Sequence, residues 1–275
     1  MASRVPAARP HRPDDWQRSL ATQYRVLSAL VYREAETRRG RRFFMGFLAS
    51  GIEPLIVVGT ISIVFTVINR PAPYGNSLVL FIATGVFPIY LFIHTSMKLR
   101  AALAPGSHRK RYPIETAYDH IAAHSLLHIL STGLVTVCFF AGLYLWGIRQ
   151  AMPWDPETAL KAIFTVFMFG VGAGIINSVI ARLFPFWDVM WPGVARGALH
   201  FSGPYFVAAY LAPDIRWYFA LNPVIHVVDW FRGAFYFFYP KSLTNIWYPI
   251  FFALGMIALG LLLEAGTRSY LEDKE

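Results

Sequence analysis

The stretch WYFALNPVIHVVDWFRGAFYFFY, residues 217–239, decides the fold more than any other part of the chain. Ten of its 23 residues are aromatic, yet Asn222-Pro223 interrupts it and it carries the charged residues Asp229 and Arg232. A bilayer span needs about 20 predominantly apolar residues, whereas shorter runs lie in the membrane interface or re-enter the membrane. Asn222 is a good helix N-cap and Pro223 a good first helical residue. We therefore expect a half-helix that begins there and is wedged between the last two membrane spans.

The spacing of side chains after Asn222 predicts two different faces on this half-helix. The apolar face consists of Val224, Val227, Val228, Phe231, Phe235 and Phe238. The more polar face consists of His226, Asp229, Gly233 and Tyr236. The pattern indicates an amphipathic, aromatic half-helix that enters the membrane without crossing it.

Composition sets the class of protein. Of the 275 residues, 56% are hydrophobic and 15% are charged, whereas about a quarter of residues are charged in soluble domains. The chain is therefore a polytopic membrane protein. Its formal charge of +9 is an orientation signal and an attraction to anionic lipid, and no fold signature of nucleic-acid binding is present. Because Cys138 is the single cysteine, a disulfide within the chain and a cysteine metal cluster are excluded.

Six apolar runs predict an all-α protein with six transmembrane helices. They lie near residues 46–68, 77–97, 119–147, 159–181, 194–212 and 247–264. An even number of spans places both termini on one side of the membrane. With both termini in the cytoplasm, 19 Lys and Arg lie on the inner face and 6 on the outer face, as the positive-inside rule requires. The outer six are Arg70, Arg149, Lys161, Arg216, Arg232 and Lys241.

A basic leader precedes the transmembrane domain, which we assign to residues 43–275. The first 42 residues contain ten Arg and no apolar core of signal-peptide type, so no cleavable secretory signal is expected. Residues 1–19 are rich in Pro and Arg and are predicted to be disordered. Residues 20–42 are predicted to form an amphipathic helix on the inner membrane surface. The alternative is an ordinary solvated helix whose arginines only fix the topology.

Glu53 is an ionisable residue inside the first predicted span, where a charge costs at least about 2.5 kcal/mol. Either it faces a polar translocation path or a neighbouring subunit, or it lies near the membrane surface and pairs with a basic residue of the preceding helix. Pro54 frees a backbone carbonyl at the same level. We therefore expect a kink with a polar side at this point.

His120, His124 and His128 lie four residues apart on one helical face, beside Asp119. Imidazoles at this spacing can share a metal ion. The alternatives are a neutral polar stripe, packed against another helix or wetted by a channel, and a proton relay. We favour the stripe and expect no metal, because membrane di-iron enzymes use several His clusters and this chain has eight His, none adjacent. A polytopic His-dependent membrane enzyme is the alternative function of another class.

No enzyme motif is present in the sequence, and the phosphate-binding loop of ATPases is missing. If the chain moves cargo actively, ATP must be hydrolysed by another protein. The predicted cytoplasmic loop of residues 98–113 carries the basic residues Lys98, Arg100, Arg109, Lys110 and Arg111. These residues either dock an acidic groove on a cytoplasmic partner or serve only as positive-inside anchors.

Several motifs follow one another in a recognisable order. They are Arg33-Glu34 with Thr37-Arg38 and Gly40, Ile52-Glu53-Pro54-Leu55 after Gly46 and Leu48, Gly85-Val86-Phe87-Pro88, Arg111-Tyr112-Pro113-Ile114-Glu115-Thr116, and Asn222-Pro223-Val224-Ile225-His226-Val227-Val228-Asp229 with Arg232-Gly233-Ala234. Their order resembles that of type-2 ABC transporter permeases, and more closely the inner-membrane subunit of capsular polysaccharide exporters. The likeness covers about residues 20–270, with Asp229 in place of that family's commoner Glu.

The resemblance implies a homodimer of this chain bound to two cytoplasmic ABC ATPase subunits, which use ATP and Mg²⁺. The chain itself would bind no cofactor and would be no enzyme. The assembly would export a lipid-linked capsular polysaccharide across the inner membrane of a double-membraned bacterium, with periplasmic and outer-membrane export proteins as further candidate partners. The 98–113 loop would couple to the ATPase with the surface helix taking part, and the half-helices between the fifth and sixth spans would cap the outer end. O-antigen, teichoic acid or another lipid-linked glycan is the alternative cargo.

A long polysaccharide needs a continuous passage in which its sugars are held weakly. Aromatic rings suit this task, because their faces bury the apolar faces of pyranoses with little loss of rotamer entropy. Candidates for the translocation path are Glu53, Tyr90, Tyr205, Tyr210, Trp217, Trp230 and Tyr236. The aromatic members are alternatively the belts that membrane proteins place at both interfaces. Arg33 and Arg38 are candidates for holding an anionic lipid or an acidic-sugar terminus.

Overall fold

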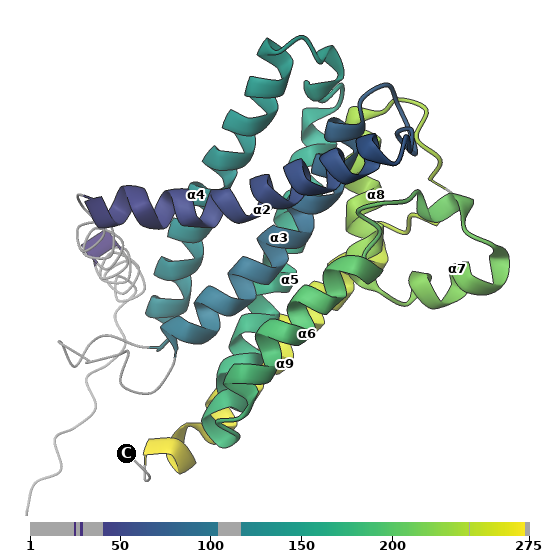
Figure 1. The fold of residues 1–275 in the computed structure, drawn as a ribbon. Coiled ribbons are helices and arrows are strands. Elements are labelled where there is room, and N and C mark those ends of the chain that lie inside the picture. Colours follow the sequence, from purple (N-terminus) through teal and green to yellow (C-terminus); the bar gives the residue numbers. More distant parts are fainter. Residues whose placement is uncertain (1–24, 26–27, 30–40, 104–116, 242, 273–275) are drawn as a thin grey trace, which may run out of the picture.

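The structure is a computed structural model that describes residues 25, 28–29, 41–103, 117–241 and 243–272. Within these residues it contains helices and loops and no strand (Figure 1). The predicted leader of residues 1–19 lies outside the described residues. Of the predicted surface helix, Arg25, Ser28 and Ala29 are described and are helical and exposed, and Arg41 and Arg42 belong to the first turn of α2.

Among the described residues, four helices are long and apolar enough to cross a membrane, which confirms the class of protein. They are α3 (Leu78–Ala102), α4 (Ala117–Leu145), α5 (Pro156–Leu183) and α9 (Trp247–Glu272). Helix α2 (Arg41–Val67) contains Pro54 and has 27 residues, a length of about 40 Å. These five helices cover the first four predicted spans and the last one.

The predicted span at residues 194–212 is not one continuous helix. Helix α6 runs from Trp187 to Phe201 and has 15 residues, so it is about 22 Å long, shorter than the roughly 30 Å of bilayer hydrocarbon. It ends because Gly203 adopts a φ of 78° and Pro204 has no backbone N–H to continue the helix. The apolar residues that follow form a loop with a short 3-10 turn, η2 (Ala208–Tyr210).

Side chains at the N-cap position explain where three helices begin. Ser77 Oγ accepts a hydrogen bond from Leu80 N at the start of α3. Asp155 Oδ1 accepts one from Thr158 N at the start of α5, and hydrogen bonding from Thr158 lowers the pKa of the Asp155 carboxyl below its ordinary value. Asn222 Oδ1 accepts one from Val224 N at 3.0 Å. The predicted start of the half-helix at Asn222-Pro223 is therefore confirmed.

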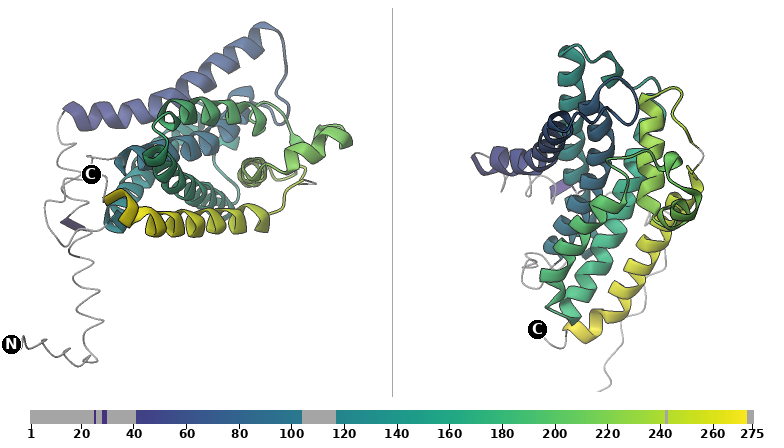
Figure 2. Two further views of the ribbon diagram at one scale, coloured as in Figure 1. Left: turned by 90° about the horizontal axis from the view of Figure 1, so that it is seen from below. Right: turned by 45° about the vertical axis from the view of Figure 1, so that its right-hand side comes forward.

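The half-helix after Asn222 is α8 (Pro223–Phe235), and it follows the short helix α7 (Pro213–Ala220). Every residue of α8 is buried, because α3, α5 and α9 all pack against it. Both the apolar face and the face that carries His226 and Asp229 are therefore enclosed by protein. The helix also ends at Phe235, so Phe238 lies beyond it and is 83% exposed. Helix α7 has no buried residue and projects from the bundle (Figures 1 and 2).

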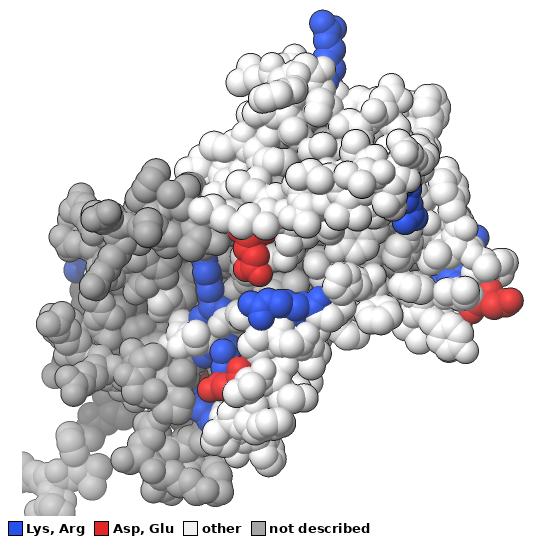
Figure 3. Space-filling model, in the orientation of Figure 1, with Lys and Arg blue, Asp and Glu red and all other residues white. Residues whose placement is uncertain are grey.

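Helix α5 is the centre of the bundle, with α3 packed along one side and α9 along another. Figure 2 places α2 and α9 on opposite sides of the bundle. The most apolar part of α3 is 89% buried, whereas that of α4 and of α9 is only 17% buried. The surface is correspondingly almost free of charge over much of the face in Figure 3. We infer that α4 and α9 present apolar surface to lipid while α3 is enclosed by protein.

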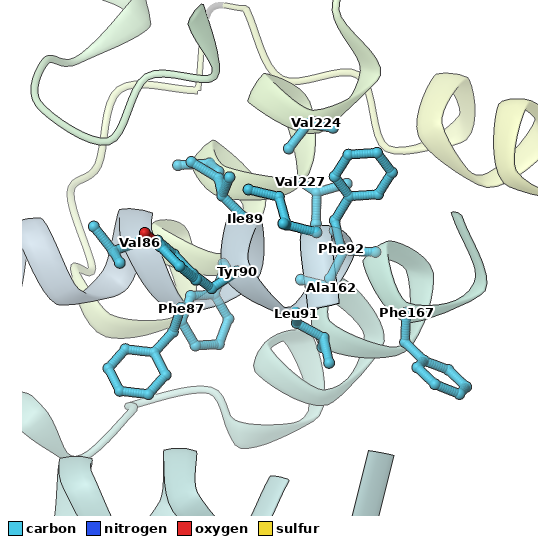
Figure 4. Close-up of a cluster of buried hydrophobic side chains, with 14 of the residues drawn as sticks. Val86, Phe87, Ile89, Tyr90, Leu91, Phe92, Ala162, Phe167, Val224 and Val227 are labelled. Atoms are coloured by element: carbon cyan, nitrogen blue, oxygen red, sulfur yellow. The ribbon is translucent and has the colours of Figure 1, made fainter. Parts of the chain in front are cut away.

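Apolar side chains of α3, α5 and α8 interlock in the core (Figure 4). Phe92 of α3 stacks on Phe169 of α5 with ring centroids 4.7 Å apart. Val224 and Val227 of α8 lie near the same cluster (Figure 4). The core therefore joins one long buried helix, α3, to both α5 and the half-helix α8.

Glycines on α5 let its neighbours approach closely, a feature that the sequence analysis missed. A Cβ at Gly170 would lie 2.7 Å from Thr95 of α3, and one at Gly174 would lie 2.8 Å from Leu99. A Cβ at Gly172 would lie 2.8 Å from backbone atoms of Met256 and Ile257 in α9. Small residues at such positions permit close packing of membrane helices. The α5 backbone is thus in near contact with both neighbouring helices.

We predict that Gly172→Ala destabilises the protein, because the added methyl group meets backbone rather than a flexible side chain. The expected loss is about 1–3 kcal/mol, as for other overpacked sites, in the free energy of unfolding measured by denaturant titration in detergent micelles. Gly255→Ala in α9 is the matched control, because nothing lies within 4 Å of its added Cβ. Equal stability of the two variants would contradict the close α5–α9 packing.

Candidate functional site

A polar cluster lies where α2, α3 and α6 meet. Glu53 Oε2 of α2 accepts a hydrogen bond from His94 Nε2 of α3 at 2.9 Å. The other oxygen, Oε1, lies 3.7 Å from Arg196 Nε of α6. The Glu53 side chain is 41% exposed and that of Arg196 is 56% exposed, whereas His94 is buried. One acidic and two basic side chains from three helices therefore converge at one level.

Aromatic side chains surround this ionic contact. Tyr90 lies one turn before His94 on α3, with ring centroids 5.3 Å apart, and it interacts electrostatically with Glu53. Tyr205 follows α6, and the centroid of its ring lies 5.8 Å from that of His200 and 6.5 Å from that of Phe65 in α2. We call the set Glu53, Tyr90, His94, Arg196, His200 and Tyr205 the Glu53 cluster. Figure 3 shows acidic and basic side chains gathered in a band between α2 and α6.

The sequence left open whether Glu53 faces a polar path or pairs with a basic residue, and the structure shows its partners among the described residues. Its partners in the described residues, His94 and Arg196, come from α3 and α6. An exposed pair such as Glu53–Arg196 contributes only about 0–1 kcal/mol. Glu53 and Arg196 can therefore give up their contact with each other and bind hydroxyl or anionic groups of a ligand instead, at a small cost in free energy. The cluster suits weak, repeated binding of a polar chain.

The other predicted path residues do not join this cluster. Glu53, Tyr90 and Tyr205 come together, but Tyr210 and Trp217 are exposed on η2 and α7. Trp230 and Tyr236 are buried, in α8 and directly after it. Sequence reasoning also missed three members of the Glu53 cluster as site residues, His94, Arg196 and His200. A signal for His94 was its position one helical turn after Tyr90 on the same face.

The predicted coupling residues that the structure describes make contacts within the chain. Arg100, at the end of α3, forms an ion pair with Asp188 at the start of α6. Lys98 Nζ lies 3.4 Å from His128 Nδ1 of α4. The remaining coupling candidates, Arg109, Lys110 and Arg111, and the predicted lipid-binding residues Arg33 and Arg38, lie outside the described residues. Their roles stay predictions.

The predicted histidine stripe lies on α4, and Thr132 Oγ1 is 3.3 Å from His128 Nδ1. The side chain of His120 is outside the described residues. In the part of the chain that the structure describes, no three His, Cys, Asp or Glu side chains come together in a way that could hold a metal ion. The contacts of His128 with Lys98 and Thr132 are those of a polar stripe packed against a neighbouring helix.

Arg232 of α8, one of the six cations counted on the outer side, is fully buried. Its guanidinium donates hydrogen bonds to the carbonyl oxygens of Gly203, Pro204 and Phe206 at 2.8–3.0 Å. It also lies over the Phe81 ring of α3, 3.9 Å from the ring centroid. The loop after α6 is thereby attached to both α8 and α3. The sequence signal was an Arg inside an apolar aromatic run.

Gly85 makes room for the Arg232 guanidinium and its loop. A Cβ at Gly85 of α3 would lie 2.6 Å from Arg232 Nη2 and 2.7 Å from Pro204 Cα. Asp229, one turn before Arg232, is also buried, and its Oδ1 accepts a hydrogen bond from Tyr239 Oη at 2.7 Å. The motif residues of α8 thus act through packing and hydrogen bonding inside the bundle.

A second buried ionic contact joins the C-terminal parts of α5 and α9. Arg182 of α5 binds Glu264 of α9 through both carboxylate oxygens, and Nη1 lies 3.3 Å from Oε1. Glu264 is buried and Arg182 is largely buried. Arg182 lies just beyond the fourth predicted span and Glu264 is the last residue of the sixth, and their pairing was not predicted from the sequence. The pair closes the end of the bundle at which Arg100 meets Asp188.

The chain matches no family model. It is similar along nearly its whole length to proteins named for capsule export. It is 26% identical to the capsule polysaccharide export inner-membrane protein CtrC of Neisseria meningitidis serogroup B, over 91% of this chain and 94% of that protein. It is 26% identical to the protein of the same description, BexB, from Haemophilus influenzae, over 90% and 93%. It is 26% identical to the polysialic acid transport protein KpsM of Escherichia coli, over 86% and 92%.

We predict that Arg232→Met lowers the free energy of unfolding by about 3–5 kcal/mol, the usual cost of removing one member of a buried ionic network. The carbonyl groups of residues 203, 204 and 206 lose their donor, and Asp229 loses the nearby positive charge. Arg232→Lys should recover only part of the loss, because an ammonium group lacks the planar fork. The measurement is denaturant unfolding in detergent.

The matched control for Arg232 is Lys161→Met, which removes an exposed cation that pairs with Glu157 in the preceding turn. We expect this variant to unfold as the unmodified protein does. An Arg232→Met protein as stable as the Lys161→Met protein would show that the guanidinium does not hold the loop.

Proposed function

We propose that the chain is the permease subunit of an ATP-driven ABC exporter, because it is similar along most of its length to capsule polysaccharide export inner-membrane proteins. In this role it carries capsular polysaccharide across the inner membrane. The observation that carries the proposal is the similarity to CtrC, which extends over nine-tenths of this chain and of CtrC. Similarity of this extent involves the whole helical bundle rather than a single motif.

We further propose that the polysaccharide passes along the Glu53 cluster, between two copies of the chain. In one copy, Glu53 and Arg196 are open to the surroundings, although they lie between helices made mostly of apolar residues. A second copy would supply the opposite wall of a passage. The Tyr205 ring and the two ring nitrogens of His200 would offer an aromatic face and hydrogen-bonding groups to sugars from one side, whereas Tyr90 is buried. Such contacts are individually weak, as a sliding polymer requires.

The ATPase is proposed to act on this passage through α3. The segment 104–116 leaves the end of α3 at which Arg100 binds Asp188 of α6. Arg100 lies six residues beyond His94 on the same helix, a rise of about 9 Å. The ion pair therefore links the two helices that carry His94 and Arg196. A push on the loop would reach the Glu53 cluster through a helix that is buried along most of its length.

The orientation follows from this proposal. The end of the bundle with Arg100 and Arg182 faces the cytoplasm, where the ATPase binds, and both termini lie on that side. The end with Tyr74, Arg149 and Trp154 then faces outward. The distribution of Lys and Arg along the sequence supports this orientation.

The experiment that tests the function is co-purification with a soluble ATPase encoded next to the chain's gene. We predict that replacing Arg109, Lys110 and Arg111 together by Glu reduces the amount of ATPase recovered by about tenfold, the effect of 1.4 kcal/mol. The physical reason is like-charge repulsion from an acidic groove. Insertion into the membrane should be unchanged, because the reversed charges lie beyond the end of α3.

The control for the loop variant reverses three cations at the other end of the bundle, Arg70, Lys161 and Lys241. This variant should retain the ATPase. Recovery of no ATPase by the unmodified chain would contradict the proposed function. Equal recovery by both triple variants would contradict the coupling role of the loop.

We predict that Glu53→Ala lowers glycan export by about tenfold, corresponding to 1.4 kcal/mol, without lowering the amount of protein in the membrane. His94 and Arg196 then lose their shared acceptor. Glu53→Gln should retain more export, because its amide oxygen still accepts a hydrogen bond. Surface polysaccharide is measured with a glycan-specific antibody and membrane protein by immunoblot. The control is Glu157→Ala, which removes an exposed carboxylate. If the two variants export equal amounts of glycan, Glu53 is excluded from the path.

A further inference from the structure

A cavity of 530 Å³ lies at the end of the bundle away from Arg100. It is bounded by the α2–α3 loop, the α4–α5 connection and the segment that follows α8. Its lining includes Tyr74, Arg149, Gln150, Trp154, Tyr236 and Phe237. A volume of this order is typical of sites for small ligands. None of its aromatic residues except Tyr236 was among the predicted path residues.

The walls of this cavity are held in place by contacts between segments distant in sequence. Trp154 Nε1 donates a hydrogen bond to Gly233 O of α8 at 3.0 Å, and its ring lies 4.9 Å from that of Phe237. Tyr74 Oη donates one to Phe238 O at 2.6 Å. Side chains fixed in this way lose little entropy when a ligand binds. The cavity is therefore formed before any ligand arrives.

The α2–α3 loop reaches the cavity because of a glycine. Gly75 has a φ of 75°, and a Cβ at this position would lie 2.5 Å from the Tyr236 ring. The Tyr74 ring can therefore pack edge-on against Tyr236, with ring centroids 5.4 Å apart. Any other residue in place of Gly75 would displace this wall.

Polar groups in the lining give the cavity a chemical preference. Of the described residues that line the cavity, Arg149 carries the positive charge, and none is acidic. Tyr236 is only 4% exposed, and its hydroxyl group is buried with no hydrogen-bond partner in the described structure. A buried hydroxyl group without a partner is costly unless a ligand or water supplies one.

We propose that this cavity binds one or two acidic pyranose units of the exported glycan at the outer end of the protein, a proposal that rests on the proposed function. The ligand carboxylate binds the Arg149 guanidinium. The apolar faces of the sugar ring pack on Trp154 and Phe237. Its hydroxyl groups bond to the Gln150 amide and the Tyr236 hydroxyl. The aromatic walls select a sugar, and the single cation selects an acidic one.

The test uses the purified full-length chain in nanodiscs of uncharged phosphatidylcholine. The probe is a fluorescent hexasaccharide of alternating glucuronic acid and N-acetylglucosamine, and binding is measured by fluorescence anisotropy. We expect Arg149→Gln to weaken binding about tenfold, which is 1.4 kcal/mol. Tyr236→Phe should also weaken binding, because it removes the buried hydroxyl group and keeps the ring. Unlabelled maltohexaose, which is neutral, should compete at least about tenfold less well than the unlabelled acidic hexasaccharide.

The matched control is Lys241→Gln, which removes one positive charge from the same end of the bundle. Lys241 packs beside Gly233 but does not line the cavity, so its variant should bind the probe as the unmodified chain does. Equal weakening by Lys241→Gln and Arg149→Gln would overturn the proposal, because it would show general attraction by charge. Absence of probe binding to the unmodified chain would overturn it as well. So would displacement of the probe by phosphatidylglycerol, which would identify an anionic-lipid site.

Failure of the cavity proposal is distinguishable from failure of the proposed function, because the binding assay needs neither ATPase nor export. Probe binding that depends on Arg149 supports the site even if no ATPase co-purifies. A chain that assembles with its ATPase and exports glycan, but binds the probe independently of Arg149, overturns the site alone.

Discussion

The buried guanidinium of Arg232 is the interaction on which the rest of the structure depends. Removing a cation from water is expensive, and only several well-placed acceptors offset the cost. Three carbonyl groups of the loop after α6, together with the face of Phe81, supply that compensation. The loop can therefore occupy one position relative to α3 and α8. Since α6 ends at this loop, Arg232 also determines where Arg196 and His200 lie.

Helix α3 connects the regions to which we assign function. Near its start, Phe81 and Gly85 receive Arg232, and in its middle Tyr90 and His94 belong to the Glu53 cluster. At its end, Arg100 binds Asp188. Because α3 is enclosed along most of its length and packs against glycines of α5, it moves with its neighbours rather than independently of them. A force applied at its end is therefore expected to reach the passage.

Composition and hydropathy could predict the class of protein and most of the long helices, because these properties are sums over many residues. The start of α8 was also predictable, since Asn222 and Pro223 act on the backbone next to them. The length of α6 was not predictable from hydropathy, because the run of apolar residues continues past the point where Gly203 and Pro204 end the helix. The burial of both faces of α8 depends on α3, α5 and α9, which are distant in sequence.

The candidate site was predictable only in part, for the same reason. Glu53 was identified because a carboxylate in an apolar run is exceptional. Its partners His94 and Arg196 come from two other helices, and nothing local to either residue indicates the contact. The structural role of Arg232 was not predicted, because its partners are backbone carbonyl groups, which carry no sequence signature.

The most direct test of the central claim, that this chain is a conduit driven by a separate ATPase, is glycan uptake into inverted membrane vesicles. A radiolabelled lipid-linked polysaccharide is presented on the outer surface of vesicles that contain the chain, the ATPase or both. Our account predicts ATP-dependent uptake only when both proteins are present. Uptake, or chemical conversion of the glycan, by vesicles that contain the chain alone would contradict it.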